Sequence, residues 1–401
     1  MTRPATVEET LPDEPLDPRT APVPRYGQAS LADLLPAVLA GQGVPDATPP
    51  GLRLEPADRV CVFLVDGMGW QALHDHPAEA PFLTSLLAGS AGGTGQPITA
   101  GFPSTTATSL ASVGTGLVPG THGLPGYTVL DPDTGKLMNQ LRWQPWTDPY
   151  RWQPFPTVFQ RAQQAGIETS QVSAPHFEHT PLTKIALSGG TFLGRLSGEE
   201  RMDLAAARLA ASDRALVYTY YADLDGNGHR YGVDSAHWRQ QLRYVDGLAQ
   251  RLAEQLPPRS ALYVTADHGM VDVPDDPESR FDFDEDWELR AGVAVLGGEG
   301  RARHVYAVPG ATADVYAVWR EVLADQAWVA TRDEAVELGW FGPPGAVADR
   351  VRPRIGDVVV AMTGNAAIIA SRNEPNESAL VGMHGSMTPA EQFVPLLQVR
   401  T

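Results

Sequence analysis

The chain has 401 residues, which is too long for a single small core and fits a large α/β domain with an appended subdomain. Its formal net charge of -18 and pI near 4.9 argue against nucleic acid or an anionic membrane surface as the main partner, because the overall field repels polyanions. A small anionic substrate still fits if metal ions neutralise it locally. The single cysteine, Cys61, lies in an apolar run and excludes an intramolecular disulfide.

The first 25 residues are acidic and rich in proline, and they contain no apolar segment of the signal-peptide kind. We therefore expect a disordered tail over residues 1–25. No run in the chain approaches the length that crosses a membrane. Together these features predict a cytoplasmic protein without a membrane partner, and they leave the oligomeric state open.

From residue 26 to 288 the apolar periodicity predicts helices alternating with strands, which is typical of a doubly wound α/β sheet. We expect helices over residues 30–41, 78–87, 106–112, 157–165, 199–211 and 235–256. We expect strands over residues 59–65, 168–173, 214–221 and 260–266. This region forms the first part of the predicted catalytic domain.

After residue 288 the elements become shorter, which predicts a small α+β insert or cap over residues 289–342. It contains expected strands over residues 291–296 and 304–308 and a helix over residues 311–323. The remaining residues, 343–401, are assigned to the catalytic domain. They contain an expected hairpin or strand pair over residues 357–362 and 366–370 and a last apolar segment over residues 392–399.

Aromatic and proline residues cluster between residues 127 and 156. This segment is interpreted either as a loop that lines a pocket or as a loop packed onto the body of the domain. Its candidate substrate-binding residues are Tyr127, Trp143 and Trp146.

Three of the apolar strands are followed by aspartates beside glycines, where open α/β sheets place their ligand sites. Asp66 follows the first strand, Asp225 and His229 follow the strand over residues 214–221, and Asp267 with His268 follows the third. His384 lies between Met383 and Gly385 near the end of the chain. Each residue taken alone also fits a turn or a helix cap. Taken together, the carboxylates and imidazoles are of the type and number that two divalent metals require.

A hydroxyl-rich stretch precedes the helix expected over residues 106–112. Phe102-Pro103 ends an extended segment, and Ser104, Thr105 and Thr106 supply side-chain oxygens where the helix begins. The start of a helix presents free backbone N–H groups and the positive end of its dipole, so it favours a phosphoryl oxygen. The stretch therefore predicts a phosphate site beside a nucleophile, with a simple capped helix as the alternative.

Five motifs in this order resemble the alkaline phosphatase superfamily and, within it, the type I phosphodiesterase/nucleotide pyrophosphatase family: VDGMG, FPSTTATSLASVGTGLVPGTHG, DLDGNGHRYG, TADHGMV and GMHG. The resemblance runs from about residue 59 to the C-terminus. It implies a mixed α/β sheet sandwiched between helices, with two zinc ions bridged by a nucleophilic threonine or serine; Mn²⁺ or another divalent metal is the alternative. One zinc would be held by Asp225, His229 and His384, and the other by Asp66, Thr106, Asp267 and His268. Alignment on Thr115-Gly116 places the nucleophile at Thr106, with Thr105 as the alternative one residue earlier.

The resemblance implies hydrolysis of a small phosphorylated substrate, such as a nucleotide, through a phospho-threonine intermediate. Zinc makes the threonine hydroxyl a better nucleophile by lowering its pKa. Relatives carry an aromatic residue after the nucleophile and an asparagine shortly after HG, whereas this chain has Ala107 and Gly126 there. The leading prediction is phosphodiester or pyrophosphate hydrolysis. Phosphomonoester or phosphonate hydrolysis, a metal-dependent phosphomutase of the same superfamily and an inert binding protein are the alternatives.

Overall fold

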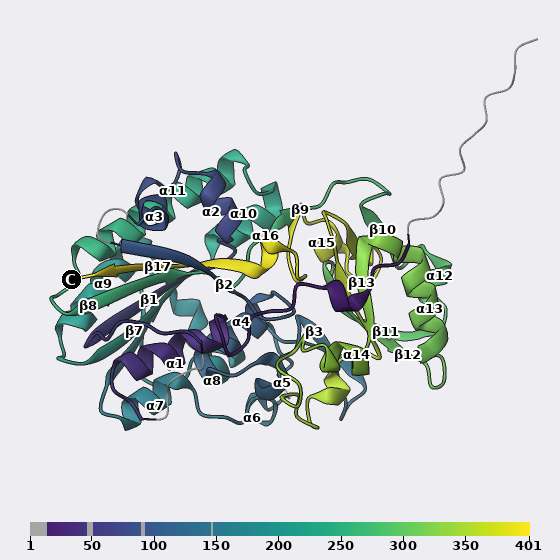
Figure 1. Ribbon diagram of the computed structural model, residues 1–401, viewed down its shortest axis with the longest axis horizontal. Coiled ribbons are helices and arrows are strands. Elements are labelled where there is room, and N and C mark those ends of the chain that lie inside the picture. Colours follow the sequence, from purple (N-terminus) through teal and green to yellow (C-terminus); the bar gives the residue numbers. More distant parts are fainter. Residues whose placement is uncertain (1–13, 46–50, 90–92, 146) are drawn as a thin grey trace, which may run out of the picture.

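The computed structural model describes residues 14–45, 51–89, 93–145 and 147–401. Figure 1 shows an elongated molecule in which a larger lobe built on a seven-stranded sheet lies beside a smaller lobe built on a four-stranded sheet. The C-terminus lies at the far end of the larger lobe (Figure 1). Within the described residues, no helix is long and apolar enough to cross a membrane.

The large sheet is mixed, and its strand order is β2-β17-β8-β1-β7-β5-β6. The strands are β1 (Arg59–Val65), β2 (Gly93–Thr99), β5 (Glu168–Ser173), β6 (Thr191–Gly194), β7 (Ala215–Tyr221), β8 (Ser260–Thr265) and β17 (Phe393–Arg400). The central β1 pairs in parallel with β7 and β8, whereas β17 runs antiparallel to both of its neighbours. Helices cover both faces of β1 and bury residues 60–65, which explains the continuous apolar run of this strand.

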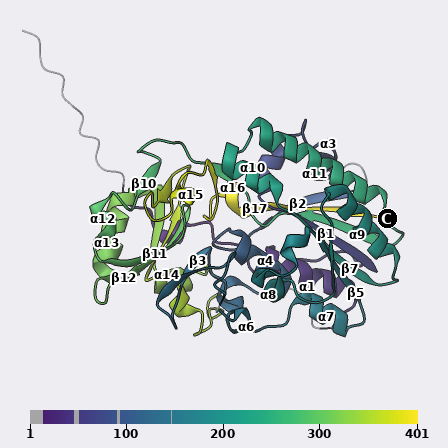
Figure 2. The same cartoon turned by 180° about the vertical axis from the view of Figure 1, so that it is seen from behind.

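Helices cover both faces of the large sheet, as Figures 1 and 2 show from opposite sides. One face carries α1 (Leu31–Gly41), α4 (Thr106–Thr115), α7 (Val158–Gln164) and α8 (Pro181–Ala186). The other carries α2 (Trp70–Asp75), α3 (Pro81–Leu87), α9 (Gly198–Ala210), α10 (Asp223–Tyr231) and α11 (Ala236–Glu254). The predicted fold class, a mixed sheet between helices, is therefore confirmed.

Local capping sets where several of these helices begin. In α1 the Asp33 carboxylate accepts hydrogen bonds from the Ser30 backbone N–H (2.9 Å) and hydroxyl (2.7 Å). In α11 the Ser235 hydroxyl oxygen accepts from the Trp238 N–H (3.2 Å). These polar contacts explain why the serine start signals located both helices to within one residue.

The small lobe is organised around the antiparallel sheet β11-β12-β14-β13. Its strands are β11 (Val293–Glu299), β12 (Ala302–Ala307), β13 (Ala327–Thr331) and β14 (Val358–Met362), and α13 (Thr312–Leu323) packs against them. Because β14 pairs with both β12 and β13, this sheet extends beyond the predicted insert boundary at residue 342.

The expected pairing of residues 357–362 with residues 366–370 is wrong. All five residues of β14 are buried, and the strand lies in the centre of the small sheet. The following β15 (Ala367–Ile369) instead pairs in parallel with β10 (Arg280–Asp282). A strand that is apolar on both faces gains more from a central position than from an edge hairpin.

Residues 14–25, which we expected within a disordered tail, have defined contacts with the small lobe. They include the short helix η1 (Pro18–Thr20). The Leu16 N–H donates to the Ala324 carbonyl (3.2 Å), and the Trp328 indole N–H donates to the Thr20 hydroxyl (3.2 Å). The structure thus differs from the expectation over this part of the tail.

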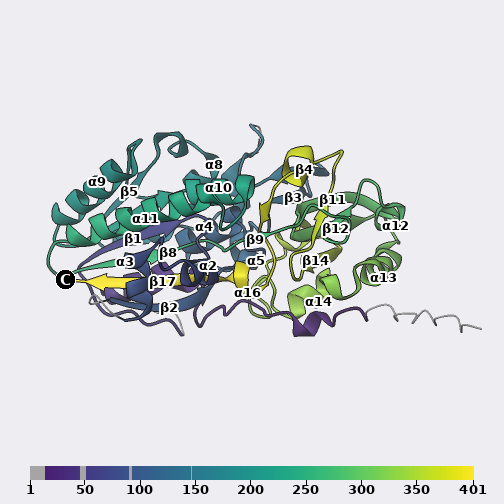
Figure 3. The same ribbon diagram turned by 90° about the horizontal axis from the view of Figure 1, so that it is seen from above.

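Short elements join the longer ones. They include the hairpin β3 (Thr128–Asp131) and β4 (Lys136–Asn139), the ladder of β9 (Val271–Asp272) with β16 (Gly382–Met383), and the helical turns α5 (Pro119–His122), α6 (Pro149–Trp152), α12 (Trp287–Arg290), α14 (Arg332–Glu337), α15 (Pro375–Ser378) and α16 (Pro389–Gln392). Seen from above in Figure 3, α10, α4 and β9 lie where the large lobe meets the small one.

Candidate metal centre and nucleophile

The topology of the large sheet brings the candidate ligands to one edge. Strands β7, β1 and β8 are parallel neighbours, with Val65 opposite Tyr221 and Leu64 opposite Thr265. Their carboxyl ends therefore meet at the same edge, which faces the small lobe (Figure 3). Asp66 follows β1, Asp267 follows β8, and the helix α10 after β7 carries both Asp225 and His229.

Two buried aspartates each anchor one carboxylate oxygen and leave the other without a hydrogen-bond partner among the described residues. Asp66 Oδ2 accepts from the Tyr220 hydroxyl, while Asp66 Oδ1 has no such partner there. Asp267 Oδ1 accepts from the backbone N–H groups of Gly67 and His268, both at 3.1 Å, while Asp267 Oδ2 has none. Buried polar atoms normally have partners, so these two orphaned oxygens mark the cluster as a candidate cation site.

The three histidines are oriented in one common way, by a backbone carbonyl at Nδ1. His229 Nδ1 lies 2.7 Å from the Gly382 oxygen, His268 Nδ1 lies 3.0 Å from the Gly269 oxygen, and His384 Nδ1 lies 2.9 Å from the Ser104 oxygen. A carbonyl only accepts, so Nδ1 carries the proton and Nε2 keeps its lone pair. This second contact is the one that fixes metal-binding histidines.

The lone pairs of these imidazoles face carboxylate oxygens. His268 Nε2 lies 3.3 Å from Asp66 Oδ1 and 3.6 Å from Asp267 Oδ2. His229 Nε2 lies 3.3 Å from Asp225 Oδ2. Two acceptors at such distances repel unless a cation or proton lies between them, so the donor set fits divalent metals.

The residues form two candidate metal-binding groups that share His268. One contains Asp66, Asp267 and His268, and the other contains Asp225, His268 and His384, with all ligand atoms of a group within 4.8 Å of one another. The second group differs from the set implied by the resemblance, which has His229 in place of His268. The His268 and His384 rings stack with centroids 3.6 Å apart, which explains why His268 reaches both groups.

The electrostatics of the cluster also favour a cation. Burial raises the pKa of Asp66 well above its usual range, and the neighbouring Asp267 and Asp225 carboxylates raise it further. Burial likewise lowers the pKa of His384 well below its usual range, with a further contribution from His268 and His229. The protein alone thus disfavours the charges that it gathers here, and bound metal ions relieve that cost.

Thr106 lies within this cluster, whereas Thr105 is turned toward the small lobe. Thr106 is the first residue of α4, and its Oγ1 lies 3.3 Å from His268 Nε2. Thr105 is the N-cap, and its hydroxyl donates to Glu299 Oε2 (3.2 Å). This geometry favours Thr106 over Thr105 as the nucleophile because only Thr106 contacts the acid–imidazole groups.

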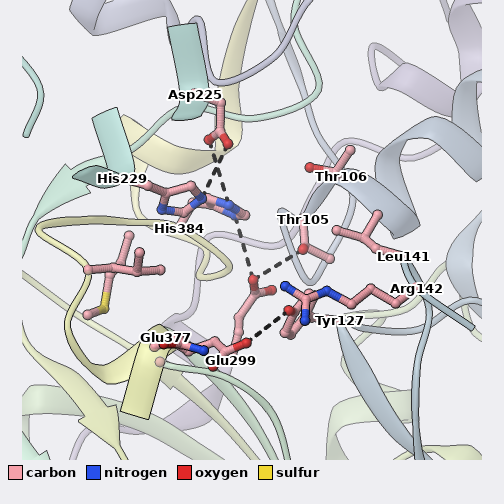
Figure 4. Close-up of a pocket in the computed structure, with 14 residues that line it drawn as sticks. Thr105, Thr106, Tyr127, Leu141, Arg142, Asp225, His229, Glu299, Glu377 and His384 are labelled. Atoms are coloured by element: carbon pink, nitrogen blue, oxygen red, sulfur yellow. Dashed lines mark hydrogen bonds and ion pairs between the residues drawn. The ribbon is translucent and has the colours of Figure 1, made fainter. Parts of the chain in front are cut away.

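A first cavity of about 320 Å³ opens in front of Thr106, and Figure 4 shows the side chains that point into it. Its lining residues are Thr105, Thr106, Tyr127, Leu141, Arg142, Asp225, His229, Glu299, Gly300, Asn376, Glu377, Leu380, Met383 and His384. Glu299 comes from the small lobe at the end of β11 and was missed from the sequence. Its flanking Gly298 and Gly300 are the same acid–glycine signal that located the candidate metal ligands.

A second cavity of about 280 Å³ lies against the same threonine and is mainly apolar. Its lining residues are Asp66, Thr106, Leu110, Leu141, Gln171, Ser173, Phe177, Thr180, Leu182, Thr183, Leu187, Phe192, Tyr218, Tyr220, Ala222 and Asp225. The two cavities share Thr106, Leu141 and Asp225. A substrate group in the first cavity and one in the second would therefore contact mostly different lining residues.

The aromatic segment contributes one of its three predicted substrate-binding residues. Tyr127 lines the first cavity, and its hydroxyl donates to Glu377 Oε1 (3.3 Å). Trp143 is buried edge-on against Trp152, with ring centroids 6.0 Å apart, and its indole N–H donates to the Gln140 carbonyl. Trp143 therefore packs in the core and lines neither cavity. Trp146 lies outside the described residues.

A mixed α/β sheet with two acid–imidazole groups and a threonine hydroxyl at one edge is typical of the alkaline phosphatase superfamily, a class that includes phosphoric ester hydrolases. Comparison with family models narrows the assignment. The model of the type I phosphodiesterase / nucleotide pyrophosphatase family matches residues 60–387, and the chain belongs to this family. The resemblance stated from the five motifs is thereby confirmed.

Individual proteins match this chain either over a short stretch of sequence or in fold at low sequence identity. Human ectonucleotide pyrophosphatase/phosphodiesterase family member 7 is 36% identical over 77 residues, which are 18% of this chain and 17% of that protein. Murine ectonucleotide pyrophosphatase / phosphodiesterase 5, solved as an inactive threonine-to-alanine variant in complex with AMP, aligns with a TM-score of 0.65 at 20% identity, over 85% of this chain and 87% of that one.

The structure of a bacterial enzyme resembles this chain in fold about as much as the murine structure does. Phosphonoacetate hydrolase from Sinorhizobium meliloti, in complex with phosphonoformate, aligns with a TM-score of 0.64 at 20% identity, over 86% of this chain and 91% of that one. At this identity, the two structural likenesses establish the shared fold.

Proposed function

We propose that this protein hydrolyses phosphodiesters or pyrophosphates of small molecules, with nucleotides as the leading substrate class, and that Thr106 is the nucleophile. The observation that carries the proposal is the position of Thr106 Oγ1, 3.3 Å from His268 Nε2 at the first residue of α4. The AMP bound to an inactive variant of the murine relative supports a nucleotide. The cytoplasmic location stays a prediction from the sequence.

The residues divide into two roles. Asp66, Asp267 and His268 would hold one divalent metal, and Asp225 with His384 would hold the other, assisted by His229 or His268. Zinc is the expected metal, with Mn²⁺ as an alternative. Two such ions, when bound, lower the pKa of a hydroxyl and neutralise charge at phosphorus.

Thr106 presents its hydroxyl at the N-terminal end of α4. The first backbone N–H groups of a helix have no partner within the helix and its dipole is positive there, so this end suits phosphoryl oxygens. Thr106 Oγ1 loses its proton to solvent and attacks phosphorus, which forms the phospho-threonine bond and breaks the bond to the leaving group, and this group departs with its electron pair. Water then attacks the same phosphorus and breaks the bond to Thr106 Oγ1, and one proton of the water restores the threonine hydroxyl.

The proposal is tested by metal analysis of the purified protein together with release of p-nitrophenol from a bis ester and from a mono ester of phosphate. We expect the bis ester to be the better substrate. Thr106→Ala should keep the fold and both metals while turnover is almost completely lost, because only the nucleophile is removed. Thr105→Val is the matched control, and activity that survives in Thr106→Ala but not in Thr105→Val would assign the nucleophile to Thr105.

Phosphomonoester or phosphonate hydrolysis is the second candidate. The observation that favours it is the guanidinium of Arg142 in the first cavity, because a cation there would neutralise the extra charge of a monoester. Faster release from the mono ester than from the bis ester would support this candidate over the first.

A further inference from the structure

The Arg142 side chain lines the first cavity and has no hydrogen-bond or ion-pair partner among the described residues. The Asn139 carboxamide oxygen accepts from the backbone N–H groups of Leu141 (2.9 Å) and Arg142 (3.0 Å), and the next residue, Trp143, is buried. The backbone is thus fixed, while the guanidinium forms no hydrogen bond or ion pair with any residue that the structure describes. Figure 4 shows it pointing into the cavity beside Tyr127. It is the one Lys or Arg that lines either cavity in the described chain.

The carboxylates that line the first cavity have partners other than Arg142. Glu299 accepts from the Thr105 hydroxyl (3.2 Å), and Glu377 accepts from the Tyr127 hydroxyl (3.3 Å). Asp225 faces His229 and belongs to a candidate metal group. The guanidinium, with several N–H donors in one plane, therefore remains available to an anionic oxygen of a ligand.

The position of Thr106 indicates which part of the substrate reaches Arg142. In a displacement at phosphorus the leaving group lies roughly in line with the attacking oxygen and on the opposite side. Thr106 contacts His268, which also belongs to the Asp66 group, whereas the first cavity is lined by Asp225, His229 and His384. With such an in-line displacement, the leaving arm would extend into the first cavity, and the retained arm would lie in the apolar second cavity beside Tyr220 and Phe177.

We propose that Arg142 is a specificity-determining residue that binds an anionic leaving group, so that the preferred substrate is a phosphoric anhydride whose retained arm is apolar or aromatic. This inference rests on the proposed hydrolase function. It assigns pyrophosphate-type substrates, rather than diesters of two neutral alcohols, to this active site.

Two substrates with the same retained arm test the proposal. Thymidine 5′-triphosphate releases pyrophosphate, and the p-nitrophenyl ester of thymidine 5′-monophosphate releases p-nitrophenolate, which carries no phosphate group. Arg142→Gln should lower kcat/KM for the triphosphate about tenfold, the effect of losing one charge-assisted contact near the surface, and should lower that for the ester clearly less. Arg142→Lys should restore most of the loss. Arg151→Gln, an exposed arginine paired with Asp133 outside both cavities, is the control.

Equilibrium binding separates this inference from the proposed function. We would titrate inorganic pyrophosphate into the metal-loaded protein by calorimetry, which needs no turnover. Arg142→Gln should weaken binding about tenfold, whereas Glu377→Gln should strengthen it, because a carboxylate that repels the anion is removed. Equal losses for the two substrates, or unchanged pyrophosphate binding in Arg142→Gln, would overturn the assignment of Arg142. Failure of the parent protein to hydrolyse either substrate would overturn the hydrolase instead.

Discussion

Tyr220→Phe should weaken metal binding at the Asp66 group without disturbing the fold. Tyr220 lies on β7, and its hydroxyl donates to Asp66 Oδ2, the oxygen opposite the orphaned Oδ1. The contact orients the Asp66 carboxylate so that Oδ1 faces His268 Nε2 at 3.3 Å. Phenylalanine keeps the ring and its packing and removes only this donor.

The size of the effect follows from the burial of the pair, because Asp66 is 4% exposed and Tyr220 is 7% exposed. A hydrogen bond to a charged group contributes about 1.5–3 kcal/mol, which corresponds to roughly ten- to hundredfold in affinity. Loss of a partner that orients a metal ligand typically has an effect of that size. We therefore expect Tyr220→Phe to weaken one metal equivalent by about ten- to hundredfold.

The assay is competition of the protein with a chromophoric chelator, and Tyr218→Phe is the matched control. Tyr218 lies two residues earlier on the same strand and also lines the second cavity, but its buried hydroxyl has no hydrogen-bond partner in the described residues. Its removal should leave metal affinity unchanged. Equal metal affinity in Tyr220→Phe and the parent protein, or equal losses in both variants, would refute the orienting role of Tyr220.

Two further predictions concern His384 and His304. His384→Ala should lower the occupancy of one metal equivalent while the fold is retained, and elemental analysis that finds two full equivalents would show that His384 is not a ligand. Burial of His304 lowers its pKa to about 4 from an ordinary 6.5, although its Nε2 lies 2.9 Å from the Pro125 carbonyl, a contact that raises the pKa; its Nδ1 accepts from the Gly356 N–H (3.1 Å). As pH falls below 6.5, His304 binds a proton in the unfolded chain before it does so in the folded one. The free energy of unfolding should therefore decrease by about 3 kcal/mol between pH 6.5 and pH 4. His304→Gln should remove this contribution to the pH dependence of the unfolding free energy measured in urea. The same slope in both proteins would contradict this account.

Sequence periodicity predicted the inner strands β1, β5, β7 and β8 of the large lobe because their apolar or β-rich runs are regular, whereas β2 and β6 of the same sheet were not predicted. The apolar runs of β1, β7 and β8 reflect burial on both faces, and glycines and serines mark the ends of the helices between them. The small lobe was less predictable. Its central strand β14 was expected beside the segment that follows it, but it pairs with β12 and β13, which lie about 30 to 50 residues away in sequence.

The candidate site, like the fold, could be predicted from the sequence only in part. The sequence by itself determined the ligand types, because acids beside glycines at the ends of parallel strands must meet at one edge of the sheet, and it placed Thr106 at the start of a helix. The tertiary structure decided which oxygens are orphaned, that His268 belongs to both groups, and that Glu299 and Arg142 reach the cavity. Strand ends are set by local pattern, whereas contacts between distant loops depend on how the two lobes pack, and no local pattern encodes that packing.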